Sequence, residues 1–407
     1  MLGDAFRRLS RRAARAELPP DEVFAQAARL LEAGDFGGAA RHATRLIERE
    51  PENPYARIVL ARAHARSGDV DEARAVLNRA IDARSSPVLV WAERAELERN
   101  AGRVAEGWAE YESRLAGPGF TRGVGGLPRW GGADPSGMRL RVIAVQGLGD
   151  SIMFARFITL LTERRARVQF PCRRNMVRLF QASFDPAEVE VTADPEADTT
   201  GIDAHVHLMS LPHLLQLPRE ALLAKEPHLR IPVDLEMAWQ ARVAAALGRS
   251  PAALKVGFMW ADNPDRSRDE DRSLPIELAR RLGEAGDGIA WFSLQVDTER
   301  SRNTGGPFPM IDLTSEMSDY ADSMGLIAAM YLVISVDTST AHATAAMGQA
   351  LWLVAPHNVC WRWVIAGTEN PWCSGVRIPR AVRPRECAPV VERVATELAG
   401  LAARKVV

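Results

Sequence analysis

Hydrophobic positions in the first part of the chain recur with the spacing of amphipathic helices, and the helices they predict come in pairs. A glycine interrupts each pair at an interval of 34 residues, at Gly34, Gly68 and Gly102. Small residues keep the same interval at Ala39, Ala73 and Gly107, where one helix can approach another closely. Each unit is therefore expected to be an amphipathic helix, a glycine turn and a second amphipathic helix.

The 34-residue period of these helix pairs resembles the tetratricopeptide repeat, and three copies in register carry that resemblance. Such repeats stack into a curved solenoid whose concave face usually binds a peptide or a protein. Two other roles stay open, because the repeats could instead cap and stiffen the next domain or mediate self-association.

The pattern changes after a stretch rich in Gly and Pro at residues 116–138, which we interpret as a linker. Beyond it, near-continuous apolar runs typical of buried parallel strands alternate with amphipathic helical segments. The predicted strands are 139–145, 166–172, 188–193, 204–210, 254–261, 289–295, 332–336 and 350–356. The predicted helices are 151–165, 274–285, 318–330, a segment after residue 337, and 387–405.

Repeated alternation of strand and helix predicts doubly wound α/β sheets. The predicted fold class is thus α plus α/β, with a helical repeat solenoid followed by two Rossmann-like halves. Two such halves are expected to hold a ligand between them, outside the carboxyl ends of the strands. The expected domains are a basic N-terminal segment (1–20), the repeats (21–115), the linker (116–138), a first Rossmann-like half (139–234), a second half (252–385) and a C-terminal helix (386–407).

One stretch of the second half, from Tyr331 to Gly348, predicts a site for an anion. It reads as a buried strand, a sharp turn at Asp337 and an Ala-rich helix. Free backbone N–H groups and the positive end of the helix dipole make such a helix start a phosphate site. Hydroxyl or imidazole groups stand in the turn at Thr338, Ser339, Thr340 and His342. The alternative is an ordinary capped helix with no ligand.

Composition and charge narrow the function classes. The formal net charge of −1 does not indicate the excess of basic residues that is typical of proteins that bind nucleic acid. Only three of the 51 basic residues are lysine, so a phosphate clamp is expected to be an arginine. No apolar run is long enough to cross a membrane, and four cysteines without metal spacing suit a reducing cytoplasm. The basic N-terminus could touch an anionic membrane surface, or could be a solvated helix.

Four segments together resemble bacterial tetratricopeptide-repeat glycosyltransferases. They are QGLGDSIMFARF (146–157), the region 256–275, FSLQ (292–295) and the region 334–364, which includes VDTSTAH. The second half is also similar to heptosyltransferases, and the whole arrangement is similar to protein O-GlcNAc transferases. The resemblance implies an inverting glycosyltransferase of the B fold that needs no bound metal. It also implies that the first half binds the acceptor and the second half binds a nucleotide sugar.

The same resemblance implies a catalytic base at Asp150, which follows the first predicted strand of the α/β part. An inverting transfer needs one group to take the acceptor's proton. The alternative is that Asp150 only caps a helix and that Gly147 and Gly149 only serve the turn. The chain departs from the family pattern nearby, because Val145 stands where a Glu is usual.

For the donor, the resemblance implies that the phosphate turn from Asp337 to His342 binds the diphosphate. Arg272 falls where the family carries a basic residue, although a solvated loop charge is the alternative. Gln295 could read the base or ribose, or could be a plain polar residue at a strand end. Trp260 and Asn263 are further candidates at the rim of the donor cleft. Trp361 and Trp363 could stack on the sugar or line the donor pocket, and a position in the core is the alternative for them.

The leading hypothesis is a cytoplasmic transferase whose repeats recruit a protein acceptor for a sugar from a nucleotide donor. One alternative is a transferase acting on a glycan or lipid-linked glycan, as heptosyltransferases do. A nucleotide-sugar epimerase and a non-catalytic repeat adaptor with a degenerate enzyme half also remain open.

Overall fold

The chain divides into two compact units, Met1–Gly117 and Pro118–Val407, which are described separately. The structure is a computed structural model. It describes residues 20–82, 87–101, 103–116, 120, 124–144, 147–217, 226–248, 254–262, 273–286, 288–296, 306–355, 362–363, 370, 373–381 and 386–405. Among the helices described, none combines the length and apolar character that a membrane crossing requires.

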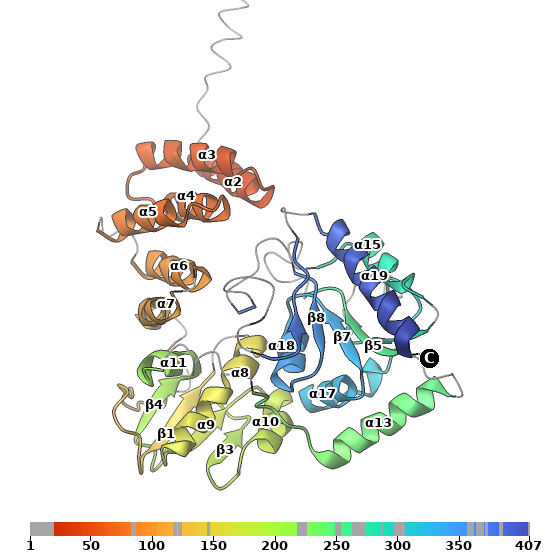
Figure 1. Cartoon of the computed structure of the whole chain (residues 1–407). Coiled ribbons are helices and arrows are strands. Elements are labelled where there is room, and N and C mark those ends of the chain that lie inside the picture. Colours follow the sequence, from red (N-terminus) through yellow and green to blue (C-terminus); the bar gives the residue numbers. More distant parts are fainter. Residues whose placement is uncertain are drawn as a thin grey trace, which may run out of the picture. The chain divides into compact units, whose positions relative to one another are not determined.

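In the part of the first unit that the structure describes, the helices from α2 to α7 form three pairs, as the 34-residue period predicts (Figure 1). The turn residues Gly34 and Gly68 have φ of 83° and 94°, a conformation that favours glycine at the end of a helix. A Cβ on Gly107 would lie 2.9 Å from the carbonyl oxygen of Ala95, so a small residue is required there. The helices are α2 (Pro20–Glu32), α3 (Phe36–Arg49), α4 (Pro54–Arg66), α5 (Val70–Asp82), α6 (Pro87–Asn100) and α7 (Val104–Tyr111).

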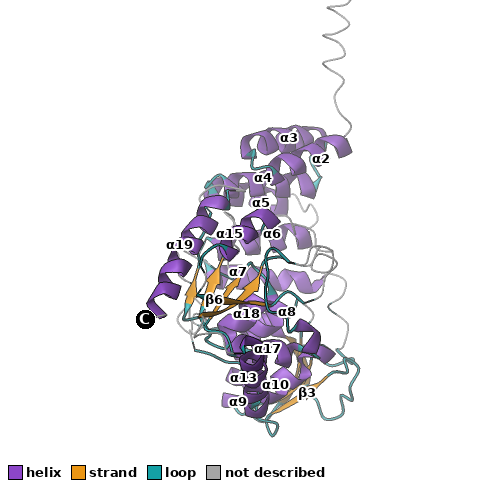
Figure 2. Cartoon of the chain, turned by 90° about the vertical axis from the view of Figure 1, so that its right-hand side faces the viewer, coloured by secondary structure: helices purple, strands orange, loops and turns teal. Residues whose placement is uncertain are grey.

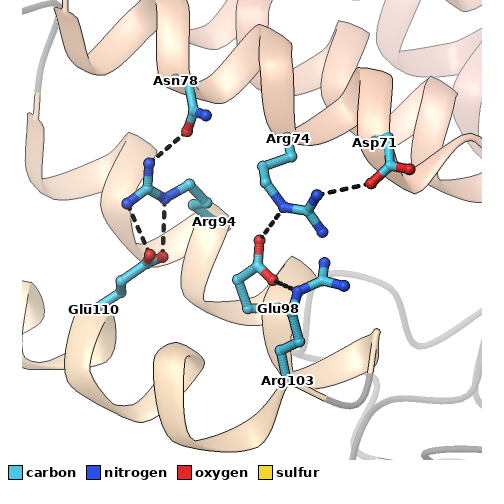
Figure 3. Close-up of polar contacts among 7 residues, drawn as sticks. All are labelled: Asp71, Arg74, Asn78, Arg94, Glu98, Arg103 and Glu110. Atoms are coloured by element: carbon cyan, nitrogen blue, oxygen red, sulfur yellow. Dashed lines mark hydrogen bonds and ion pairs between the residues drawn. The ribbon is translucent and has the colours of Figure 1, made fainter.

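A network of charged side chains ties α5, α6 and α7 together (Figure 3). Arg94 on α6 donates two hydrogen bonds to the carboxylate of Glu110 on α7, at 3.0 and 2.7 Å. Glu98 on α6 is only 4% exposed and accepts from Arg74 on α5 at 2.7 Å and from Arg103. Charge-assisted bonds of this kind are stronger than neutral ones, so they add to the apolar packing between repeats.

Replacing Glu98 with Ala is expected to lower the free energy of unfolding by about 1–3 kcal/mol, because two arginines lose their shared acceptor. The measurement is urea unfolding of the whole chain, followed by far-ultraviolet circular dichroism. Glu72→Ala is the control, because the Glu72–Arg79 pair is exposed and screened by solvent, so its loss should leave the free energy of unfolding almost unchanged. Equal losses for the two variants would contradict a special role for Glu98.

The second unit contains two parallel sheets. In the first sheet the order is β3-β2-β1-β4, and the strands are β1 (Arg139–Ile143), β2 (Arg167–Pro171), β3 (Val189–Thr192) and β4 (Ala204–His207). Helices α8 (Leu148–Phe154), α9 (Arg156–Glu163), α10 (Val177–Ser183) and α11 (Leu211–Leu214) accompany it. Trp130, from the segment interpreted as a linker, is buried, and its backbone N–H donates to the carbonyl of His205 in β4.

The second sheet has the order β6-β5-β7-β8-β9, again parallel throughout. Helices α15 and α19 lie on one side of it, and α17 and α18 lie on the other (Figures 1 and 2). Its strands are β5 (Leu254–Met259), β6 (Ile289–Ser293), β7 (Leu332–Ser335), β8 (Leu351–Leu353) and β9 (Val376–Arg377). Its helices are α15 (Ile276–Gly283), α17 (Tyr320–Ala328), α18 (Ser339–Ala346) and α19 (Ala388–Lys405). The predicted fold class, helical repeats followed by two α/β halves, is confirmed.

The sequence analysis missed helices α10, α11 and α13, of which α13 is the longest. Helix α13 (Val233–Leu247) occupies the interval between the two predicted halves and packs against α17. Within α13 only Trp239 and Val243 are buried, so its apolar stripe is too narrow to give a clear helical pattern. Trp239 is fully buried, and its Nε1 donates to Asp322 of α17 at 3.0 Å.

Candidate active site

Helix α8 follows β1 along the chain, and its bounds fix the position of Asp150. Helix α8 begins at Leu148 with Gly147 as its N-cap residue, so Asp150 is the third residue of the first turn. The hypothesis that Asp150 caps this helix is therefore wrong. The single helix predicted from residue 151 is also wrong, because Ala155 separates α8 from α9.

The predicted phosphate turn has the geometry expected of a strand that runs into a helix. β7 ends at Ser335, and α18 begins at Ser339 with Thr338 as its N-cap residue. The side chain of Thr338 does not cap the helix; its hydroxyl lies 3.3 Å from that of Ser335. Ser339 and Thr340 are half-buried, so the first turn of α18 presents its N–H groups beside two hydroxyl side chains.

The first turns of α8 and α18 are brought together, although they belong to different halves (Figure 1). A Cβ added to Gly149 would lie 2.7 Å from Cδ2 of His342, so only glycine allows this approach. The imidazole of His342 stacks on Trp363, with ring centroids 4.3 Å apart. Trp363 in turn donates from Nε1 to Asp337 at 2.6 Å. Four of the predicted residues thus lie together: Gly149, Asp337, His342 and Trp363.

Arg362 pairs with Asp150 across the two halves, and the sequence analysis did not single it out. Its Nε and one terminal nitrogen each lie 2.8 Å from Oδ1 of Asp150. The low lysine content had indicated an arginine at the phosphate site, but it could not say which one.

Other predicted donor residues lie elsewhere or outside the described residues. The ring of Trp260 is 4% exposed and packs in the core of the second half, instead of lining the rim as expected. Gln295 is 2% exposed, and its Oε1 accepts from the backbone N–H of Ala261 at 3.2 Å, which fits the structural alternative. Asn263 and Arg272 fall outside the described residues, as does Trp361.

Beneath this site, a buried polar group joins the two halves. Arg156 of α9 donates to Nδ1 of His228 at 3.1 Å and also contacts Sγ of Cys373 at 3.8 Å. His228 lies 2.9 Å from the carbonyl of Ile152, so its Nε2 carries the proton. Burial, with the positive charge of Arg156 beside it, lowers the pKa of His228 to about 3. These contacts with Arg156 and the backbone of Ile152 give His228 a structural role.

This histidine is expected to make stability depend on pH. The pKa of His228 is depressed on folding, so above its unfolded value of about 6.5 neither state binds the proton. As the pH falls from 6.5 toward 3, His228 binds a proton in the unfolded state but not in the native state. The free energy of unfolding should then fall by up to about 1.4 kcal/mol per pH unit. His228→Gln should remove this part of the slope in urea unfolding between pH 7 and 5; an unchanged slope would contradict it.

Comparison with known proteins agrees with this two-part architecture. A tetratricopeptide-repeat family model matches residues 30–97. Protein FlbA from Caulobacter vibrioides is 27% identical over 380 residues, which cover 83% of this chain and 60% of that protein. The chain therefore spans about 60% of the length of this curated relative.

Several glycosyltransferases are among the solved structures to which this chain is similar. A family 9 glycosyl transferase from Veillonella parvula has 10% identity and a TM-score of 0.49, covering 67% of this chain and 98% of that one. ADP-heptose lps heptosyltransferase II of E. coli has 13% identity and a TM-score of 0.48, covering 66% and 100%. An O-GlcNAc transferase variant from Thermobaculum terrenum has 14% identity and a TM-score of 0.32, covering 95% and 91%.

The chain thus combines a segment matched by the tetratricopeptide-repeat model with a part built on two parallel sheets, whose halves meet at Asp150 and α18.

Proposed function

We propose that the chain is an inverting, metal-independent glycosyltransferase that moves a sugar from a nucleotide donor to an acceptor. The observation that carries this proposal is the meeting of a carboxylate from one half with a phosphate-binding helix start from the other. Asp150 lies in the first turn of α8, which packs against the first turn of α18. Inverting transfer needs these two elements close together, because the base and the leaving group act on opposite sides of one anomeric carbon.

In the proposed reaction, the acceptor oxygen attacks the anomeric carbon while the bond from that carbon to the donor phosphate breaks. The acceptor's proton passes to the carboxylate of Asp150. The bonding electrons leave with the nucleoside diphosphate. No redox partner is needed, and the charge balance closes with one proton on Asp150 and one extra negative charge on the leaving group.

The extra charge on the leaving group would be stabilised by α18. Its first-turn N–H groups, together with the hydroxyl groups of Ser339 and Thr340, can donate to phosphate oxygens. Where no metal binds the diphosphate, a cationic side chain is needed beside these donors. Asp337 is not a phosphate ligand in this scheme, because its carboxylate accepts from Trp363 and would repel the phosphate.

We further propose that the acceptor is a protein recruited by the repeats. The tetratricopeptide-repeat model matches residues 30–97, and solenoids of such repeats usually bind peptides or proteins.

The test is a thermal-shift screen of the whole chain against nucleosides, nucleoside diphosphates and nucleotide sugars. A donor at 100 times its Kd should stabilise the native state by about 2.7 kcal/mol and raise the midpoint. The variant Thr338→Ala/His342→Ala should lose the shift. Absence of a shift with every nucleotide would overturn the proposal and would favour a repeat adaptor without activity.

A further inference from the structure

The ion pair between Arg362 and Asp150 lies beside the proposed donor site. A bound phosphate and the carboxylate of Asp150, the proposed base, would therefore compete for the guanidinium. Arg362 follows β8 in the second half, whereas Asp150 belongs to the first half, 212 residues earlier. Both contacting nitrogens of Arg362 approach the same carboxylate oxygen. The Arg362 side chain remains 23% exposed, so part of the guanidinium is open to solvent.

The backbone beside this arginine is held against the donor side of the site. Asn370 donates from Nδ2 to the carbonyls of Arg362 and Trp363, at 3.2 and 3.1 Å. Trp363 is bonded to Asp337, the residue just before the N-cap of α18, and stacks on His342. These contacts keep the Arg362 backbone near the first turn of α18. Rotation of the side chain alone would therefore carry the guanidinium from Asp150 to a phosphate bound there.

Electrostatics favours that exchange once a donor is bound. A diphosphate carries more negative charge than one carboxylate, and a planar guanidinium can bind two phosphate oxygens together. The carboxylate of Asp150 thus holds the place on Arg362 that a phosphate would take. A carboxylate that has lost its guanidinium partner also accepts a proton more readily.

We propose that Arg362 is the arginine that binds the donor diphosphate, that Asp150 holds it in the ligand-free protein, and that its transfer to the diphosphate frees Asp150 to act as the base. This inference rests on the proposed function and names a catalytic residue for it. It makes base activation dependent on donor binding, because one guanidinium cannot serve both anions at full strength.

The experiment measures Kd by calorimetry for ADP, UDP and GDP and for the matching nucleosides, using the whole chain. Arg362→Ala should weaken binding of the preferred diphosphate by about 10- to 100-fold and leave nucleoside binding unchanged. Arg362→Lys should recover part of the loss, since the charge is retained. Asp150→Asn should tighten diphosphate binding several-fold, because the competing carboxylate is neutralised. The double variant should bind no tighter than Arg362→Ala.

Arg178→Ala is the matched control. Arg178 of α10 also forms an ion pair between the halves, at 2.9 Å from Asp319 and from Asp322, but away from the site. It should leave every nucleotide affinity unchanged. If diphosphate binds wild type and Arg362→Ala equally well, the inference is overturned while the proposed function stands. If no diphosphate binds wild type, the proposed function fails, and the inference fails with it.

Discussion

Asp150→Asn is expected to slow glycosyl transfer by about 10²–10⁴-fold, the range that general-base catalysis contributes. The amide cannot take the acceptor's proton, although its shape and position in the first turn of α8 are kept. The loss should fall on kcat, because the donor still binds. The measurement is release of nucleoside diphosphate from the nucleotide sugar that the binding screen identifies, at saturating donor.

Arg362→Ala separates the role of Asp150 as a base from its role in the ion pair. Both variants break the Arg362–Asp150 contact, but only one removes the carboxylate. The Arg362 variant should lose affinity for the donor, whereas the Asp150 variant should lose turnover with the donor bound. Transfer by Asp150→Asn within a few-fold of wild type would show that another group is the base.

Trp239→Ala is expected to reduce the free energy of unfolding by about 3–5 kcal/mol, as is typical of emptying a large buried aromatic site. Trp239 is 0% exposed and fills the space over Gly325, where an added Cβ would meet its ring. The variant also removes the hydrogen bond to Asp322. Urea unfolding followed by far-ultraviolet circular dichroism measures the loss, and the tryptophan change does not affect that signal appreciably.

Met237→Ala is the control on the same helix. Met237 is 64% exposed, so its removal should change stability by less than about 0.5 kcal/mol. If the two variants destabilise the chain equally, α13 is not anchored by Trp239, and its packing on α17 adds little to the second unit.

Features that depend on local sequence were the most predictable. The glycine turns at Gly34 and Gly68 follow from the repeat, because a left-handed turn needs glycine and the helices on either side show their own periodicity. The strand, turn and helix from β7 to α18 could be read for the same reason. By contrast, α13 was missed because only two of its residues are buried, so most of its sequence carries no burial pattern.

Side-chain roles were less predictable than elements. A strand-end tryptophan such as Trp260 can point into the core or toward a ligand, and the alternation along a strand does not say which face will be covered. Gln295 could serve a ligand or a neighbouring backbone group, and the structure places it against the N–H of Ala261. The choice depends on which elements pack above each sheet.

The sequence by itself determined the helical repeats, the two parallel α/β halves and the phosphate-type turn before α18, because periodicity and turn chemistry act over a few residues. Only the tertiary structure decided that Gly149 approaches His342 and that Arg362 meets Asp150. The physical reason is distance along the chain: 212 residues separate Arg362 from Asp150, and their contact depends on how two separately formed sheets pack together.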